Sequence, residues 1–338
     1  ALPMVRAMFL EYPQDAYCCH IGVQYQFMLG RELLIAPVYQ NVAADEMGND
    51  VRNNIYLPDK EQIWIDYFTG EKYQGGQVLN NFEAPLWKLP VFVKSGAILP
   101  MYEENNTPDK VDRTRRFVEF WPEGESQYTV YEDDGKFLSN QTREDEDYGV
   151  IDHVSYGESL RTVYRCLVEG DRAVLRAEKS EGSYPGYEPE RTTTFLVHLT
   201  ERPAKITAKN GSDLLKMCKA QSREEFQKAV PGKGEAVWFY DENPEIETYA
   251  SAREEKLAKL VEHVKAAPVL LVRLAVADTG KVSQSVEITG YVNAKPRQEE
   301  RENPALAVPT LSVPEEKKTS DSIWLTWTET EGAERYEM

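Results

Sequence analysis

Cysteine and histidine are scarce in this chain, with four of each among 338 residues. No C-x-x-C pair occurs, and the adjacent Cys18 and Cys19 cannot easily form a normal disulfide, so free thiols are expected. His20 beside Cys19 is the one local grouping of two metal-ligating residue types. So sparse a supply of ligands argues against zinc, and we predict no metal site.

Long apolar runs and an excess of positive charge are missing too. No segment approaches the roughly 18 apolar residues of a membrane span, and Pro3 and early charges exclude an opening signal peptide. The chain holds 39 Lys and Arg against 57 Asp and Glu, a formal net charge of −18. Attraction between basic side chains and phosphate supplies most non-specific affinity for nucleic acids and anionic membranes. We therefore predict neither partner.

Short β-patterned runs dominate what is present. Segments such as 62–68 and 89–101 recur about every ten residues between turn signals, which predicts a mainly β fold of sandwich type in two or three domains. Helical patterns cover 222–230 and 251–268. In the second, Ser251 can cap the start, and one face carries Leu257, Leu260, Val261 and Val264.

The ends of the chain have their own patterns. Residues 2–13 (LPMVRAMFLEYP) form an apolar run broken by Arg6, which predicts a buried strand, and the run starts abruptly, as if cut from a longer chain. Residues 138–160 are polar and predict a loop, and residues 298–308 predict a linker. The tail restarts an alternating strand with Ile323, Leu325 and Trp327 on one side.

The stretch TVYEDDG raises the question of catalysis, because Glu132, Asp133 and Asp134 are consecutive acids. Neighbouring residues on a strand point to opposite faces, so such a pair cannot grip one sugar between two carboxyls. The common calcium loop needs ligands at alternate positions, and Gly135 comes too early for it. Asp-Gly after a strand predicts a turn at a hairpin tip.

Two further residue sets allow either a functional or a structural interpretation. A polar loop around Gly48 could bind calcium or be solvated; its oxygen-bearing residues are Asp45, Glu46, Asn49 and Asp50. Several aromatic residues could stack on sugars, although core positions are commoner in a β-rich chain: Trp64, Tyr67, Phe68, Trp87 and Trp121. No G-x-S-x-G, P-loop or H-E-x-x-H motif occurs.

Five segments follow one another in a distinctive order: LPMVRAMFLEYPQD, YQFMLGRELLIAPVY, NNIYLPDKEQIWIDYFTGEKYQGG, APLWKLPVFVKSGAILPM and TVYEDDG. This order resembles the C-terminal half of glycoside hydrolase family 31, the α-glucosidase and α-xylosidase family. GSYPGYEPERTTTFLV is similar to the distal β-domain of that family. The tail, with Trp327 and ERYEM, resembles the first strands of a fibronectin type III module.

The resemblance implies a domain order. Residues 1–30 would be the end of a catalytic (β/α)₈ barrel, residues 31–112 a proximal β-sandwich, and residues 113–297 a distal β-domain with one or two helices. A linker over 298–308 would lead to the incomplete fibronectin III-like module over 309–338.

The resemblance also implies a mechanism whose residues lie elsewhere. Family members are retaining enzymes, in which one Asp attacks the sugar and another acts as acid and base. Neither Asp motif, W-x-D-M-N-like or G-D-N-like, is present, and MGNDV (47–51) only scrambles the letters. No catalytic residue carries over, substrate-binding residues stay unassigned, and the mechanism implies no cofactor. Arg6 could order the sugar pocket or form a buried ion pair.

These expectations define a function to test. The chain would be the C-terminal accessory part of a retaining α-glycosidase, bracing the barrel and not catalytic alone, with an α-linked oligosaccharide as substrate. α-Glucosidase-type hydrolysis is expected first, with α-N-acetylgalactosaminidase or α-glucosyltransferase activity as alternatives. A free-standing carbohydrate-binding or adhesion protein, or an independent enzyme, also stays open. Similarity to multimodular bacterial enzymes implies an extracellular or cell-surface location.

Overall fold

The structure is a computed structural model in which two units are described separately, Ala1–Pro296 and Arg297–Met338. It describes residues 2–46, 48–85, 87–102, 107, 110–135, 137–139, 154–156, 158–244, 266–293, 311–312 and 326–327. The fold is mainly β, as the sequence predicts.

A six-stranded sheet organises the first part of the chain, called here the N-terminal module. In spatial order it contains β1 (Val5–Ala7), β2 (Phe27–Leu29), β3 (Leu33–Ile35), β10 (Val91–Lys94), β6 (Ile63–Asp66) and β7 (Lys72–Gln74). Two small ladders join β4 (Asp50–Arg52) to β9 (Phe82–Ala84) and β5 (Ile55–Leu57) to β8 (Gln77–Leu79). Their core surrounds the fully buried Trp64, whose indole Nε1 donates to the Pro58 carbonyl at 2.9 Å.

The opening segment departs from the predicted buried strand. Only Val5–Ala7 is extended; the chain then turns into helix α1 (Met8–Glu11), followed by 3₁₀ turns η1 (Ala16–Cys19) and η2 (Ile21–Val23). Of the apolar side chains here, Met8 is buried, whereas Val5, Phe9 and Leu10 face solvent. The prediction was wrong because a short apolar run does not by itself separate a strand from a helical turn.

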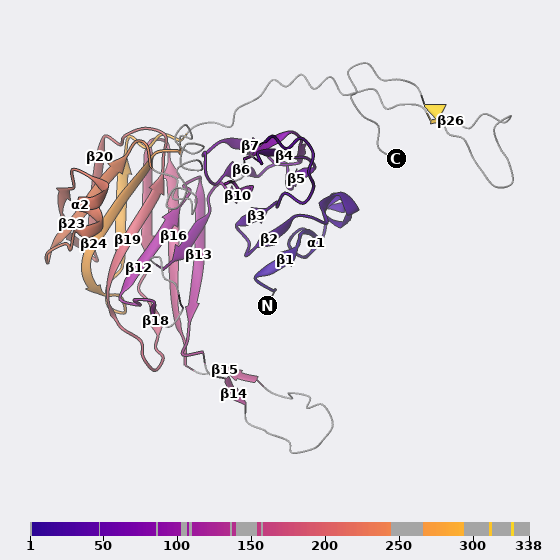
Figure 1. Ribbon diagram of the computed structural model, residues 1–338. Coiled ribbons are helices and arrows are strands. Elements are labelled where there is room, and N and C mark those ends of the chain that lie inside the picture. The colour runs from indigo at the N-terminus through magenta and orange to yellow at the C-terminus, as the bar shows by residue number, and fades with distance from the viewer. Residues whose placement is uncertain are drawn as a thin grey trace. The chain divides into compact units, whose positions relative to one another are not determined.

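A sandwich of two large sheets, the sandwich module, follows, and Figure 1 draws its strands from magenta to orange. One sheet has the order β11 (Ile98–Met101), β12 (Arg115–Phe120), β19 (Glu190–His198), β24 (Val269–Asp278), β23 (Glu235–Asp241) and β22 (Lys216–Lys219). The other has the order β13 (Glu125–Glu132), β16 (Leu160–Glu169), β17 (Arg172–Ala177), β25 (Gln284–Thr289), β20 (Lys205–Asn210) and β21 (Asp213–Leu214), with β18 (Glu181–Gly182) beside β16.

Alternation along the strands supplies the sandwich core. On β16 the burial pattern alternates over its first seven residues, which places Tyr164 and Cys166 inside. Phe120 and Phe195, from the paired strands β12 and β19, stack with ring centroids 5.5 Å apart. The predicted helix over 222–230 is α2 (Arg223–Lys228), capped by the Ser222 hydroxyl, and its Phe226 is buried.

Other expected elements are only partly described. The expected loop over 138–160 is partly wrong, because β14 (Phe137–Ser139) and β15 (Val154–Tyr156) form a short ladder within it and β16 begins at Leu160. In the second unit, β26 (Leu311–Ser312) pairs with β27 (Thr326–Trp327). The linker over 298–308, and Ile323 and Leu325, lie outside the described residues. The helix predicted over 251–268 lies outside them up to residue 265, and residues 266–268 are not helical. Within the described part, none of the helices combines the length and apolar character needed to cross a bilayer.

The two modules meet at a buried joint. Ile65 and Val93 of the N-terminal module pack with Ala97 and Trp121 in one apolar cluster. The Trp121 amide donates to the Ala97 carbonyl at 2.9 Å, and Trp121 accepts from the Gly96 amide at 2.7 Å. An added Cβ at Gly70 would lie 2.4 Å from Cβ of Ala267, so the backbones approach closely there.

Substituting alanine at Gly70 tests this joint. Gly70 has φ +72°, and Gly30 has φ +64° but nothing within 4 Å of the place that an added Cβ would take, so both variants share the left-handed backbone cost. Gly70→Ala adds a clash with Ala267 and should cost about 1–3 kcal/mol more than Gly30→Ala in urea unfolding. Equal losses would show that the joint yields without cost.

Candidate functional site

Exposed apolar side chains concentrate near the start of the chain. Of the nineteen large hydrophobic residues that are exposed in the described structure, eleven fall within residues 2–42. We define the apolar face as Leu2, Met4, Val5, Phe9, Leu10 and Ile21; Met4 and Ile21 are 74% and 70% exposed. Several large exposed apolar side chains within twenty residues of chain are the composition expected of an interaction surface.

Buried charge holds the backbone beneath the apolar face. Arg6 donates from Nε to the Gly30 carbonyl at 3.1 Å and lies 3.4 Å from the Glu11 carboxylate. Both side chains are more than nine-tenths buried, whereas Arg31, on the other side of Glu11 at 3.5 Å, is mostly exposed. Arg6 therefore forms the buried ion pair that was one of its two predicted roles.

Two further charged residues, Glu32 and Lys94, interact electrostatically with Glu11 of this ion pair. Burial raises the pKa of Glu32 although Lys94 opposes the shift, and burial lowers the pKa of Lys94 although Glu32 opposes that. The Lys94 ammonium lies 5.2 Å from the centre of the Tyr12 ring. Desolvation therefore shifts the pKa of both groups more than their mutual attraction does.

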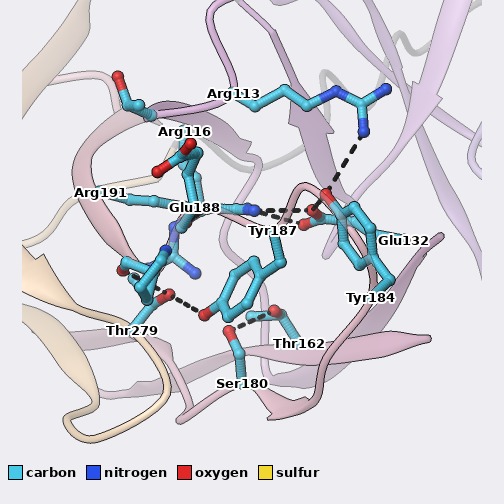
Figure 2. Close-up of polar contacts among 12 residues, drawn as sticks. Arg113, Arg116, Glu132, Thr162, Ser180, Tyr184, Tyr187, Glu188, Arg191 and Thr279 are labelled. Carbon is cyan, nitrogen blue, oxygen red and sulfur yellow. Dashed lines mark hydrogen bonds and ion pairs between the residues drawn. The ribbon is translucent and has the colours of Figure 1, made fainter. Parts of the chain in front are cut away.

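The sandwich module contains a buried ion pair between its two sheets, shown in Figure 2. Arg191 on β19 reaches Glu132 at the end of β13 through two hydrogen bonds of 2.9 and 3.0 Å. Burial alone would lower the pKa of Arg191, but the bonds and charge of Glu132 raise it. Tyr184 donates to the same carboxylate at 3.2 Å, and Arg113 donates to the Tyr184 hydroxyl at 3.4 Å.

A second arginine links the same sheets. Arg116 on β12 donates to Thr193 on β19 at 3.0 Å and to Gln284 on β25 at 2.9 Å. Gln284 passes the connection to Asn210 on β20 at 2.9 Å. These contacts and the Arg191 pair satisfy buried polar groups deep in the sandwich, which is a structural role.

Polar groups also cross the joint between the modules. Tyr67, from the N-terminal module, donates to Glu119 on β12 at 3.0 Å, and His198 Nε2 lies 2.6 Å from the same carboxylate. The His198 ring stacks on Trp121 with centroids 3.4 Å apart. At the other edge of the joint, Lys72 donates to Asn293.

The acidic run is a turn, as predicted, and provides no pair of catalytic acids. Strand β13 ends at Glu132, Gly135 has φ +69°, and its amide donates to Asp133 at 2.9 Å. The turn does not join two consecutive paired strands, as a hairpin tip would, because β13 pairs with β16. Glu132 turns inward to Arg191, whereas Tyr131 is exposed on the opposite face.

The other metal candidates have structural partners. Asp50 accepts the amides of Val42 and Ala43 at 3.0 and 2.8 Å, and Asp45 accepts the Asn49 amide at 2.8 Å. These bonds lower the pKa of Asp50 and order the loop. His20 caps η2 by accepting the Gly22 amide. No group of three or more metal-ligating side chains occurs in the described part of the chain.

The aromatic candidates are core or partly covered. Trp64 and Trp121 are buried, Tyr67 belongs to the joint, and Phe68 packs edge-on against Trp87 at 5.7 Å. Sequence reasoning missed Tyr25 and Tyr39, which are exposed and stack with ring centroids 3.8 Å apart. Their signal was weak: two isolated tyrosines in polar segments.

Comparison with known proteins identifies the class. Residues 1–99 match the model described as "Glycosyl hydrolase family 31 C-terminal domain". "Alpha-glucosidase 2" of Bacillus thermoamyloliquefaciens is 28% identical over 206 residues, covering 61% of this chain and 22% of that protein. "Isomaltosyltransferase" of Sporosarcina globispora is 42% identical over 100 residues, covering 30% of this chain and 8% of that protein.

A solved structure shares the fold. A Flavobacterium johnsoniae family 31 dextranase, complexed with isomaltotriose, has a TM-score of 0.56 and 24% identity, covering 85% of this chain and 29% of that chain. The chain spans less than a quarter of the two curated relatives. Residues 1–99 carry the glycoside hydrolase family 31 C-terminal domain, and the chain is similar to a C-terminal portion of proteins of this glycosidase family.

Removing the charge of Glu132 tests the ion pair between the sheets. Glu132→Gln leaves the Arg191 guanidinium buried without a counter-charge and should cost about 3–5 kcal/mol of unfolding free energy. Glu287→Gln, in the exposed pair with Arg172, should cost about 1 kcal/mol or less. Equal losses in chemical denaturation would contradict the bridging role.

Lys72 gives the joint a pH dependence. Burial lowers its pKa from 10.5 to about 8, so between these values the unfolded chain binds a proton that the folded chain has lost. The free energy of unfolding should therefore rise with pH through this window, by about 1–3 kcal/mol relative to Lys72→Met. Urea unfolding of the wild type and of Lys72→Met at pH 7.5 and pH 10 measures this difference. If the free energy of unfolding changes equally with pH in both proteins, the prediction is refuted.

Proposed function

We propose that this chain is the C-terminal accessory part of a retaining α-glycosidase, where it braces a catalytic barrel and is not catalytic alone. The observation that carries the proposal is the apolar face, which lies inside the matched segment of residues 1–99. A barrel packed on this face would remove Met4, Val5 and Phe9 from water, which favours association.

Catalysis is assigned to the rest of the parent protein. Two of the acids considered as catalytic or metal-binding candidates have structural partners: Glu132 pairs with Arg191, and Asp50 accepts backbone amides. The two Asp motifs of the family are absent from this sequence. A retaining reaction needs two carboxyl groups about 5–5.5 Å apart, one as nucleophile and one as acid and base.

The substrate class follows from the curated relatives. Those named are an α-glucosidase and an isomaltosyltransferase, so an α-linked glucose oligosaccharide is the substrate proposed for the parent protein. Hydrolysis is placed ahead of glucosyl transfer, and α-N-acetylgalactosaminide cleavage behind both. The proposed location is extracellular or at the cell surface, where polymeric substrates of this kind are met.

A free-standing adhesion or sugar-binding module accounts less well for the apolar face. Such a protein would leave six large apolar side chains in water near the short strand β1, which invites aggregation. Packing against a barrel explains the same surface and the order of the family segments together.

A charge placed on the apolar face tests the proposal in the full-length parent protein. Phe9→Asp should lower the melting temperature and reduce α-glucoside hydrolysis at least tenfold, because the charge must be buried against the barrel. Leu214→Asp, at an exposed site on β21, should leave both unchanged. The chain alone should release no glucose. Turnover by the chain alone, or equal effects of both variants, would contradict the proposal.

A further inference from the structure

Tyr25 and Tyr39 form a layered group with a buried arginine. Their rings are 3.8 Å apart at an interplanar angle of 20°, and the Arg52 guanidinium lies 4.6 Å from the centre of the Tyr39 ring. Tyr39 therefore contacts both Arg52 and Tyr25. Tyr25 is 44% exposed, so part of its ring is open to solvent.

Arg52 fixes both tyrosine segments from beneath. It is 2% exposed and donates from Nε to the Pro37 carbonyl at 2.9 Å, two residues before Tyr39. A second nitrogen reaches the Tyr25 carbonyl at 3.5 Å. Burial lowers the pKa of Arg52 while its contact with Tyr39 opposes the shift. The buried guanidinium thus joins two segments that the sequence separates.

The chain after Tyr39 is ordered as well. The Asp50 carboxylate accepts the amides of Val42 and Ala43, and Asp45 holds Asn49 through both its amide and side-chain nitrogens. Hydrogen bonds before and after Tyr39 thus fix its position, and Tyr25 stacks on its ring. The Tyr25 ring therefore has little conformational entropy left to lose on binding.

The surroundings distinguish this pair from the apolar face. Exposed amide side chains flank the tyrosines in the sequence, Gln24 before Tyr25 and Gln40 and Asn41 after Tyr39, together with the exposed Val38 and Val42. Amides both donate and accept hydrogen bonds, as sugar hydroxyls do, whereas the apolar face consists of aliphatic and phenyl groups. A flat ring bordered by amides suits the apolar face of a pyranose ring better than a protein core.

We infer that Tyr25, positioned by Tyr39 and Arg52, is a stacking subsite for a neutral α-linked glucose oligosaccharide. The inference rests on the proposed function and deepens it: the subsite would hold sugar units remote from the bond that is cleaved. It would give the parent protein a preference for longer substrates without taking part in the chemistry.

The test is a comparison of substrate lengths in the full-length parent protein. Malto- and isomalto-oligosaccharides of two to seven units are compared with an aryl α-glucoside. Tyr25→Ala should raise KM about tenfold for the longest substrates, leave kcat unchanged, and change KM for the aryl glucoside less than twofold. Tyr25→Phe keeps the ring and should retain the wild-type preference. Tyr131→Ala, at another exposed tyrosine, is the matched control.

Each other outcome has a definite meaning. Equal changes for long and short substrates, or none, would overturn the subsite. A lowered melting temperature with no effect of length would show that protein covers the pair instead. A wild-type protein that is inactive on every α-glycoside would refute the proposed function separately. Calorimetry with maltoheptaose and isomaltoheptaose would then test the subsite alone. The subsite stands if Tyr25→Ala abolishes binding, and it falls if the wild-type protein binds neither sugar.

Discussion

The joint between the N-terminal module and the sandwich module is the contact on which the rest depends. Trp121 lies at its centre, buried among Ile65, Val93 and Ala97 and stacked on His198. The backbone bonds at Gly96 and Ala97 continue the sandwich strands into the N-terminal module without a flexible linker. Close packing and these backbone bonds hold the two modules together at this joint.

Charge burial follows one pattern throughout. Arg6, Arg52, Arg116 and Arg191 are all less than a tenth exposed, and each binds groups from distant segments. Arginine suits this use because its planar guanidinium offers several donors in fixed directions and stays charged. Although acidic residues outnumber basic ones in this chain, some arginines are buried, where they hold distant segments together.

Sequence periodicity and turn residues were enough to predict most of the fold. The β-patterned runs 62–68 and 89–101, the cap at Ser222 and the Asp-Gly turn each depend on neighbouring residues, and each was predictable. The helix at Met8, the inward turn of Glu132 and the tyrosine pair depend on contacts between residues that are distant in the sequence. Sequence alone gives no distance between such residues, so these features needed the structure.

Strand order has a consequence for synthesis. β24 lies between β19 and β23 in the middle of its sheet, yet it spans residues 269–278, far along the chain. Until it leaves the ribosome, two strands rich in apolar residues have open hydrogen-bonding edges. β19 ends at residue 198 and β23 at residue 241, so both edges stay open until residues 269–278 have been synthesised, and a chaperone would be useful during that interval.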